Sequence, residues 1–171
     1  FTCVVVPNSI IFEDLIPVYC DIELDTFGPS IDSIKKLVSK KTKVILIQHL
    51  FGLVCKDYQE IISFAKKKNL LIIEDCAQSL GAEYKNIKIG NYGDASFYSM
   101  QHSKIISSGD GGIVVTNNDK LYKRLVDINT ECKNQSIDQV KRVLYGIKNI
   151  YLNDRLIKIN RYLPLINNKI N

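Results

Sequence analysis

"LLIIED", residues 70–75, is an uninterrupted apolar run that ends on two carboxylates. Four consecutive apolar residues without polar alternation are typical of a strand that is covered on both faces, as in a parallel sheet. A second run of this kind, "KVILIQHL" at 43–50, lies upstream. Helical patterns alternate with such runs along the chain. The sequence therefore predicts an α/β fold with three α/β/α layers and a mostly parallel sheet.

The expected elements follow from the apolar spacing. Strands are predicted at residues 17–22, 43–50, 70–75, 95–100 and 112–116, and helices at 31–38, at 58–68 and after Asn117 or Asn118. Ser30 is a candidate cap for the first of these helices. Asp57 and Glu60 have the spacing of a capping box at the start of the second. Helices of this number and position could cover both faces of one sheet.

Charge is unevenly distributed along the 171 residues. Residues 1–118 carry 12 Lys and Arg against 13 Asp and Glu, a net charge of −1, whereas residues 119–171 carry 11 against 5, a net charge of +6. We expect a partial large domain at 1–130 and a basic amphipathic helical tail at 131–171. The simpler interpretation of the tail is a helix packed on its own domain. Contact with an anionic membrane surface or a partner is the alternative.

Three further classes of function are disfavoured by the composition. The near-neutral first part has no nucleic-acid recognition motif, which argues against binding of nucleic acid. Five cysteines, an odd number without a CxxC pair, indicate reduced thiols in the cytoplasm rather than a disulfide framework. His49 and His102 lack a third ligand at suitable spacing, so no metal site is predicted. The chain begins with Phe1 inside what reads as a domain, and we expect it to be a fragment.

Polar side chains follow the predicted parallel strands at their carboxyl ends, the edge where open α/β sheets bind ligands. They are Gln48, His49, Asp75, Gln78, Ser99 and Lys104. Each alone has an ordinary explanation: an aspartate there commonly caps a helix, a lysine commonly lies on the surface, and a histidine belongs to the core or its edge. Their convergence on one edge predicts a site.

The block from residue 72 to 119 carries four short motifs in order: E-D-x-A-Q, G-D, S-x-x-x-x-K and G-D-G-G. It resembles the core of the DegT/DnrJ/EryC1/StrS family of sugar aminotransferases, which depend on pyridoxal 5′-phosphate (PLP). The resemblance covers about residues 1–130. It implies an incomplete large domain of the fold-type-I PLP-dependent transferases, the fold of aspartate aminotransferase.

The resemblance also implies a role for four residues. Lys104 matches the lysine that forms the Schiff base with the cofactor aldehyde, and Asp75 matches the carboxylate that pairs with the pyridine nitrogen. Gln78 matches a residue close to the cofactor ring, and Ser99 one that bonds the cofactor phosphate. Cys3 stands where the family usually carries an aromatic residue stacked on the cofactor, which leaves less π-face contact.

By the same resemblance, the activity is transfer of an amino group from glutamate or glutamine to a nucleotide-linked keto sugar. Such products enter lipopolysaccharide, other surface glycans or antibiotics, and family members form homodimers. The presence of Lys104 argues against the dehydratase branch of the family, in which the lysine is replaced. The alternative is a catalytically incompetent fragment or partner-binding remnant, because the family's main phosphate-binding loop and smaller domain are not found in this sequence.

Overall fold

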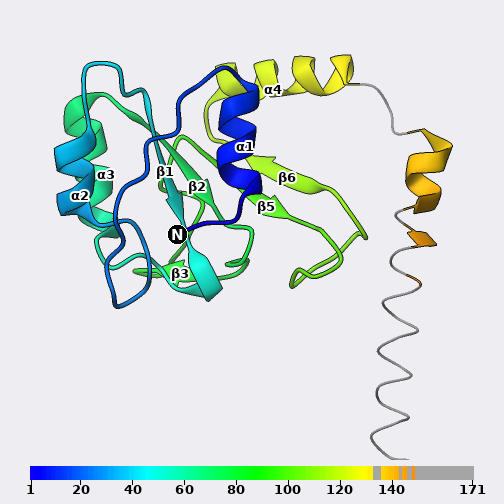
Figure 1. Ribbon diagram of the computed structural model, residues 1–171, viewed down its shortest axis with the longest axis horizontal. Helices are drawn as coiled ribbons and strands as arrows, with labels where there is room; N and C mark the ends of the chain where they lie inside the picture. Colours follow the sequence, from blue (N-terminus) through cyan, green and yellow to red (C-terminus); the bar gives the residue numbers. More distant parts are fainter. Residues whose placement is uncertain (133–135, 143, 146–147, 149–171) are drawn as a thin grey trace, which may run out of the picture.

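The computed structural model describes residues 1–132, 136–142, 144–145 and 148 (Figure 1). Its main sheet has four strands in the order β1-β2-β5-β6, namely Val44–Gln48, Leu71–Asp75, Ala95–Ser99 and Gly112–Val115. The first three strands are parallel, and β6 runs antiparallel to β5. The predicted α/β fold with a mostly parallel sheet is thus confirmed, as are four of the five predicted strands.

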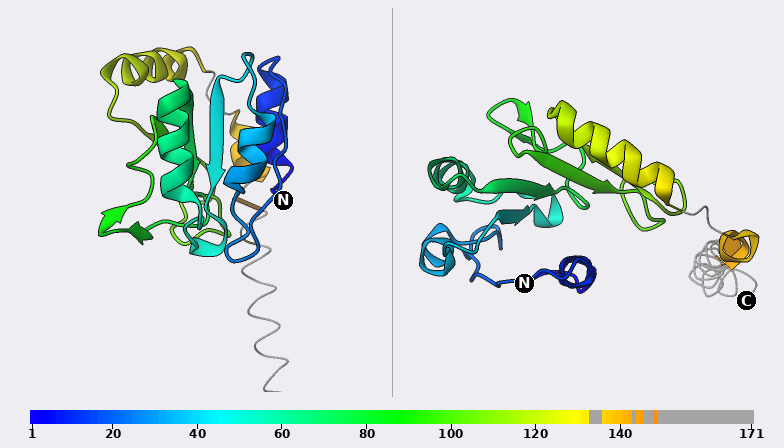
Figure 2. Two further views of the ribbon diagram at one scale, coloured as in Figure 1. Left: turned by 90° about the vertical axis from the view of Figure 1, so that its left-hand side faces the viewer. Right: turned by 90° about the horizontal axis from the view of Figure 1, so that it is seen from above.

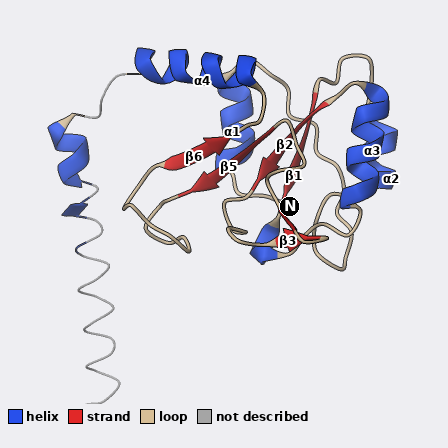
Figure 3. Ribbon diagram, turned by 180° about the vertical axis from the view of Figure 1, so that it is seen from behind, coloured by secondary structure: helices blue, strands red, loops and turns tan. Residues whose placement is uncertain are grey.

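Helices flank this sheet on both sides. They are α1 (Val5–Phe12), α2 (Ile31–Leu37), α3 (Tyr58–Lys68) and α4 (Asp119–Glu131), with a short 3-10 turn η1 (Leu50–Gly52) after β1. Figure 2 shows α3 and α4 on one side of the sheet and α1 on the other, with α2 next to α3 beside β1. A separate hairpin of β3 (Glu83–Tyr84) and β4 (Ile87–Lys88) lies below the sheet in the view of Figure 3.

The hydrophobic core lies between β1, β2 and the two adjacent helices. Its buried residues are Ile31, Ile34, Ile45, Ile47, Cys55, Tyr58, Ile61, Ile62, Ala65 and Ile72. The α3 members recur at intervals of three and four, and those of β1 alternate, as the helical and strand periods require. Tyr58 packs edge-on against Tyr84 and Tyr92, with ring centroids 5.3 and 5.2 Å away, so the hairpin segment is attached to the start of α3.

The prediction of a strand at residues 17–22 was wrong. Residues 17–21 have no regular structure, and Ile22 forms only an isolated bridge with Pro29. The backbone hydrogen bonds of this segment go to a neighbouring turn: Asp21 accepts from the amide of Ser30 at 2.9 Å, and its own amide donates to the Ser33 hydroxyl. Apolar composition predicted an extended segment here, but among the described residues no strand lies beside it to form a ladder.

The helix starts were predicted with mixed success. Asn118 caps α4 as expected, because its side chain accepts from the amides of Lys120 and Leu121. The predicted capping box at α3 does not form, since the Asp57 carboxylate accepts no bond from its own helix. It instead accepts from the amide of Ile31, the first residue of α2, at 3.0 Å. Asp57 therefore joins two helices rather than capping one, and the Ser30 side chain makes no cap bond.

The predicted tail helix is described only in part. Residues 137–142 are helical, and the remainder of 131–171 lies largely outside the described residues. Within the described part, none of the helices combines the length and apolar character needed to cross a bilayer. All five cysteines are free thiols, with Cys55 and Cys76 buried.

The Glu74 side chain is the most heavily hydrogen-bonded group of the core. It is fully buried and accepts bonds from the His49 ring at 3.2 Å and from the Tyr58 hydroxyl at 2.5 Å. Burial opposes its ionisation, but the bonds from His49 and Tyr58 outweigh that cost and lower the pKa of Glu74 to about 2. The carboxylate is therefore a permanent charge that ties β2 to the end of β1 and to α3.

Three backbone amides complete the shell around Glu74. Those of Gly90, Tyr92 and Gly93 donate to its two oxygens at 2.9, 3.0 and 2.7 Å. Glycine is needed at two of these positions. Gly90 has a φ of +89°, and a Cβ on Gly93 would lie 2.9 Å from the Ile72 carbonyl oxygen. Replacement of either glycine would push the loop away from the carboxylate.

We predict that Glu74 contributes acid-sensitive stability. Its pKa falls from 4.5 in the unfolded chain to about 2 in the folded one. Its contribution to the free energy of unfolding is therefore complete above pH 4.5 and lost as the pH falls towards 2, a change of about 3 kcal/mol. Urea unfolding between pH 7 and 3 should show the part of this loss that falls above pH 3 in the wild type, while Glu74→Gln should be less stable at pH 7 and depend less on pH. The exposed Glu131→Gln is the control; a Glu74→Gln variant as stable as this control at pH 7 would contradict the prediction.

Candidate functional site

The carboxyl ends of the parallel strands meet at one edge of the sheet. Gln48 is paired with Asp75 in the register of β1 and β2, and Asp75 with Phe97 in that of β2 and β5. Ser99 ends β5 two residues further along. The predicted convergence of these strand ends is therefore present. Side chains of paired residues in parallel strands point to the same face, so Gln48 and Asp75 project together.

Asp75 is buried at this edge, with only 2% of its surface exposed. One carboxylate oxygen accepts from the Gln48 side-chain amide at 2.8 Å, and the other from the Ala77 backbone amide at 3.0 Å. Burial raises the pKa of Asp75, whereas the bonds from Ala77 and Gln48 and the charges of Lys104 and His49 act in the opposite direction. The ionised form of Asp75 is thus costly, and another cationic donor would stabilise it.

Lys104 lies in the connection between β5 and β6 and is partly buried. Its backbone amide donates to the Gln101 carbonyl at 2.9 Å, within a loop that is closed by a bridge between Gln101 and Gly109. Its ammonium is near enough to Asp75 for its charge to lower the pKa of that carboxyl. In the described part of the chain it has no salt-bridge partner. No hydrogen bond or ion pair within residues 1–132 joins Lys104 to Asp75, and their meeting at one cofactor site stays a prediction.

Gln78 and Ser99 lie in the same part of the molecule, but their side chains accept hydrogen bonds from backbone amides of nearby loops. The Gln78 side-chain oxygen accepts from the amide of Phe51 at 3.0 Å, which joins the loop after β2 to η1. The Ser99 hydroxyl accepts from the amide of Gln101 at 3.4 Å. Among the described residues, no hydrogen bond links either side chain to Asp75 or Lys104. Their predicted cofactor contacts stay predictions.

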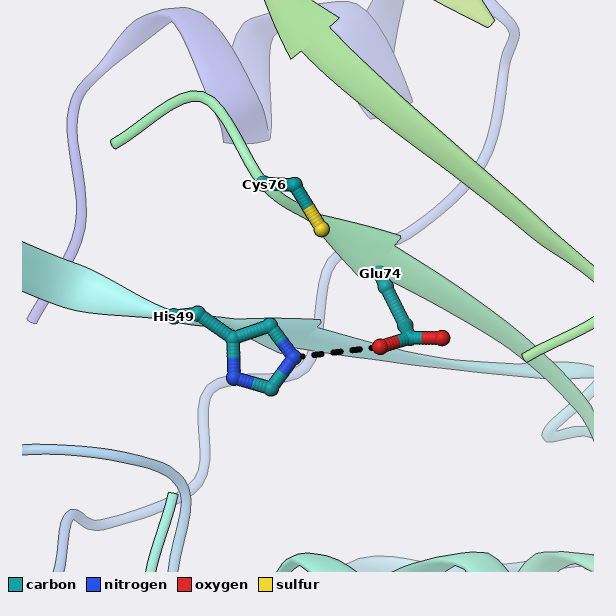
Figure 4. A group of neighbouring side chains, drawn as sticks. All are labelled: His49, Glu74 and Cys76. Carbon is teal, nitrogen blue, oxygen red and sulfur yellow. Dashed lines mark hydrogen bonds and ion pairs between the residues drawn. The ribbon is translucent and has the colours of Figure 1, made fainter. Parts of the chain in front are cut away.

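His49, Glu74 and Cys76 form a buried group whose ligand atoms lie within 4.8 Å of one another (Figure 4). Metal binding requires a deprotonated thiol and free lone pairs on the carboxylate. Burial raises the pKa of Cys76 to about 12, and the Glu74 carboxylate already accepts five hydrogen bonds. The His49 nitrogen that faces Glu74 is used in one of them. This group therefore serves packing, and His49 is a core histidine as expected.

Two features of the site were not predicted from the sequence. The first is the role of Glu74, which precedes Asp75 and faces the opposite side of the strand. The second is the contact of Gln48 with Asp75, although Gln48 had been placed at the same edge. The signal available in the sequence was positional only: both residues stand at the ends of apolar runs. The donors that surround Glu74 come from segments up to 25 residues away, which no local pattern reveals.

The donor set at this edge fits the chemistry of PLP. A pyridine nitrogen that must stay protonated needs a buried carboxylate with spare acceptor capacity. Each Asp75 oxygen has accepted a single hydrogen bond from the chain, and burial leaves the ionised group short of positive partners. A lysine without a salt bridge lies nearby to attach the aldehyde. The fit rests on Asp75 and Lys104; Ser99 and Gln78 would be auxiliary contacts.

The fold and this pair of residues together define a class, the large domain of the fold-type-I PLP-dependent transferases. The model of the DegT/DnrJ/EryC1/StrS aminotransferase family matches residues 1–156, and the chain belongs to that family. The match extends past residue 130, where the sequence placed the end of the resemblance. The domain boundary at 130 itself stays a prediction.

Relatives support this assignment in sequence and in structure. The chain is 39% identical over 117 residues to the GDP-perosamine synthase of Escherichia coli O157:H7, a match that covers 68% of the chain and 32% of the relative. It superposes on the aminotransferase from Psychrobacter cryohalolentis with a TM-score of 0.69 and 35% identity, over 72% of this chain and 31% of the other. The chain thus spans about a third of the length of these relatives.

A third relative bears on the cofactor. The GDP-4-keto-6-deoxy-D-mannose-3-dehydratase of E. coli, solved with bound hydrated PLP, matches with a TM-score of 0.68 and 26% identity, over 74% of this chain and 32% of that one. PLP is therefore confirmed as the cofactor of this family and fold. The relatives include sugar aminotransferases, which confirms the predicted class of enzyme for the family.

We predict that Asp75→Asn stabilises the fold. The pKa of Asp75 is raised by burial, so its ionised form costs free energy at neutral pH, and this cost disappears as the pH falls through the folded-state pKa. The asparagine can keep both bonds, because the Gln48 amide can turn and present its oxygen, which has no partner here. The urea midpoint at pH 7 should rise relative to the wild type and to the exposed control Asp127→Asn. A lower midpoint would show that the carboxylate is needed for folding.

Proposed function

We propose that this chain carries the cofactor-binding core of a PLP-dependent aminotransferase that moves an amino group from glutamate or glutamine to a nucleotide-linked keto sugar. The observation that carries the proposal is the buried Asp75 at the ligand-binding edge of a parallel sheet, with Lys104, which has no salt-bridge partner among the described residues, near enough for its charge to act on it. The relatives point to the substrate class, since one of them is named for a GDP-linked amino sugar. The amino donor follows from the family resemblance.

The two principal residues have different tasks in this proposal. PLP, when bound, withdraws electrons from the substrate carbon that carries the amino group. Asp75 would hold a proton at the cofactor's ring nitrogen, for which it must stay ionised. Lys104 would hold the cofactor through its side-chain amine, and that amine, when free, would carry a proton. Ser99 would donate to the cofactor phosphate, and Gln78 would lie against the ring.

The first test is the absorbance spectrum of the full chain with added PLP. We expect a band near ~420 nm, the usual signature of PLP attached to a lysine. The band should be absent in Lys104→Ala and present in Lys67→Ala, which removes an exposed lysine from α3. Borohydride reduction followed by peptide mass spectrometry should locate the label on Lys104 in the wild type.

The outcomes separate the two interpretations of this chain. A band that survives in Lys104→Ala would show that another lysine attaches the cofactor. The absence of a band in all three proteins would favour the alternative, a catalytically incompetent fragment or partner-binding remnant. Transfer of an amino group from glutamate or glutamine to a nucleotide-linked keto sugar, followed by mass spectrometry of the sugar, tests the activity itself.

We also propose a homodimer in the cytoplasm. The segment before α2 exposes a series of large apolar side chains, as a surface buried by association would. They are Phe1, Val4, Val5, Ile11, Phe12, Leu15, Ile16, Val18 and Tyr19. Five free cysteines suit a reducing compartment.

The dimer is tested by light scattering coupled to size exclusion. We expect twice the monomer mass of 19.4 kDa for the wild type. Val5→Glu and Phe12→Glu should shift the mass to the monomer, because a charge buried in an apolar interface is costly. Val114→Glu, on the exposed strand β6, is the control. Monomeric wild type at all concentrations would refute the dimer.

A further inference from the structure

We propose that Gln48 is a positioning residue of this site: its side-chain amide holds the Asp75 carboxylate in the ionised form and in one orientation, as the pairing with the cofactor's ring nitrogen requires. The inference rests on the proposed function and adds to it a residue outside the family motif block. It starts from the 2.8 Å bond between the Gln48 amide nitrogen and one Asp75 oxygen.

The chemistry of the two groups fixes the direction of this bond. An ionised carboxylate only accepts hydrogen bonds, so the amide must turn its NH2 end to Asp75. A bond to a charged acceptor is about twice as strong as a neutral one. Gln48 therefore favours ionised Asp75 over the protonated form, against the effect of burial. Lys104 and His49 are the titratable groups whose positive charge would act in the same direction.

The side-chain oxygen of Gln48 indicates that this residue does more than fill space in the core. This oxygen is buried and has no hydrogen-bond partner among the described residues. An unpaired buried acceptor costs free energy, and an apolar side chain of similar size would avoid that cost. The compensation available at this position is the bond to Asp75. The Gln48 amide thus stabilises the Asp75 carboxylate, although its own oxygen stays unpaired in the core.

The backbone makes this contact geometrically rigid. Gln48 and Asp75 are paired in the parallel ladder of β1 and β2, so their side chains leave the sheet side by side. The amide of the next residue, His49, donates to the Asp75 carbonyl at 3.1 Å and extends the ladder by one bond. The second Asp75 oxygen is fixed by the Ala77 amide. The carboxylate plane is therefore set by two donors on separate segments.

The experiment measures Asp75 directly in the full chain without cofactor. The pH titration of its side-chain carbon by NMR should give a pKa higher by about one to two pH units in Gln48→Leu than in the wild type, because a hydrogen bond to the charged form is lost. Gln48→Glu has the shape of glutamine but sets a second carboxylate against the first, so the apparent pKa should rise further. Gln59→Leu, an exposed change on α3, should leave it unchanged.

These variants separate positioning from packing. Gln48→Glu raises the pKa of Asp75 through its own charge whatever the role of Gln48, so the comparison that decides is that between Gln48→Leu and Gln59→Leu. An Asp75 pKa that is equal in Gln48→Leu and Gln59→Leu would overturn the proposal. This measurement requires no PLP, so a negative result here can be distinguished from a failure of the proposed function.

A second readout extends the test to the loaded protein. PLP affinity, followed through the band near ~420 nm, should fall about tenfold in Gln48→Leu and stay unchanged in Gln59→Leu. In an Asp75→Asn background the same Gln48 substitution should have a smaller effect on PLP affinity, because the charge that the amide stabilises is gone. An additive loss in the double variant would show that Gln48 acts on the cofactor by another route.

Discussion

The buried Glu74 carboxylate is the constraint on which the rest of this structure depends. It accepts five hydrogen bonds, from a strand end, a helix start and the loop before β5. A one-residue slip of β2 would turn Glu74 to the other face and leave those donors unpaired inside the core. Because successive side chains of a strand alternate, fixing Glu74 on one face fixes Asp75 on the other. The structural carboxylate Glu74 thus sets the position of Asp75, the carboxylate that we propose holds the cofactor.

The two adjacent carboxylates are nonetheless opposite in their electrostatics. Both are buried, and burial raises the pKa of each, but Glu74 has enough donors to bring its pKa down to about 2, whereas Asp75 does not and its pKa stays raised. Glu74 has no need of a ligand. Asp75 is the group that gains from one, since a positively charged donor would relieve the cost of its burial. The number of hydrogen-bond donors around each carboxylate, rather than the residue type, distinguishes the structural Glu74 from the candidate site residue Asp75.

The apolar runs predicted β1 and β2 closely because uninterrupted apolar sequence has one good solution in a layered α/β fold, a strand covered on both faces. The same logic failed at 17–22, where apolar residues exist without a neighbouring strand. The hairpin of β3 and β4 was missed because two-residue strands carry no period to detect. Helix α1 was missed as well. Its residues are all exposed or half-buried, so no face of this helix is packed in the core, and its sequence has no apolar stripe that would reveal a helix. For the site, the sequence was enough to predict the polar residues at the strand ends and to single out Lys104. The donors to Glu74 and the Gln48 partner of Asp75 could not be predicted, because they depend on the register between segments.

The site combines a part that lies in the sheet with a part that lies in an exposed loop. Gln48 and Asp75 belong to a parallel ladder and are reinforced by the buried network behind them. Lys104 belongs instead to an exposed connection, whose hydrogen bonds run mainly within the loop itself. This division suits the chemistry that we propose for the two residues. A carboxylate that must hold a ring nitrogen gains from rigidity, whereas an amine that first attaches a cofactor and then carries protons has to occupy more than one position. The half of the site that contains Asp75 is therefore reinforced by the Glu74 network, whereas the loop around Lys104 is held by its own hydrogen bonds.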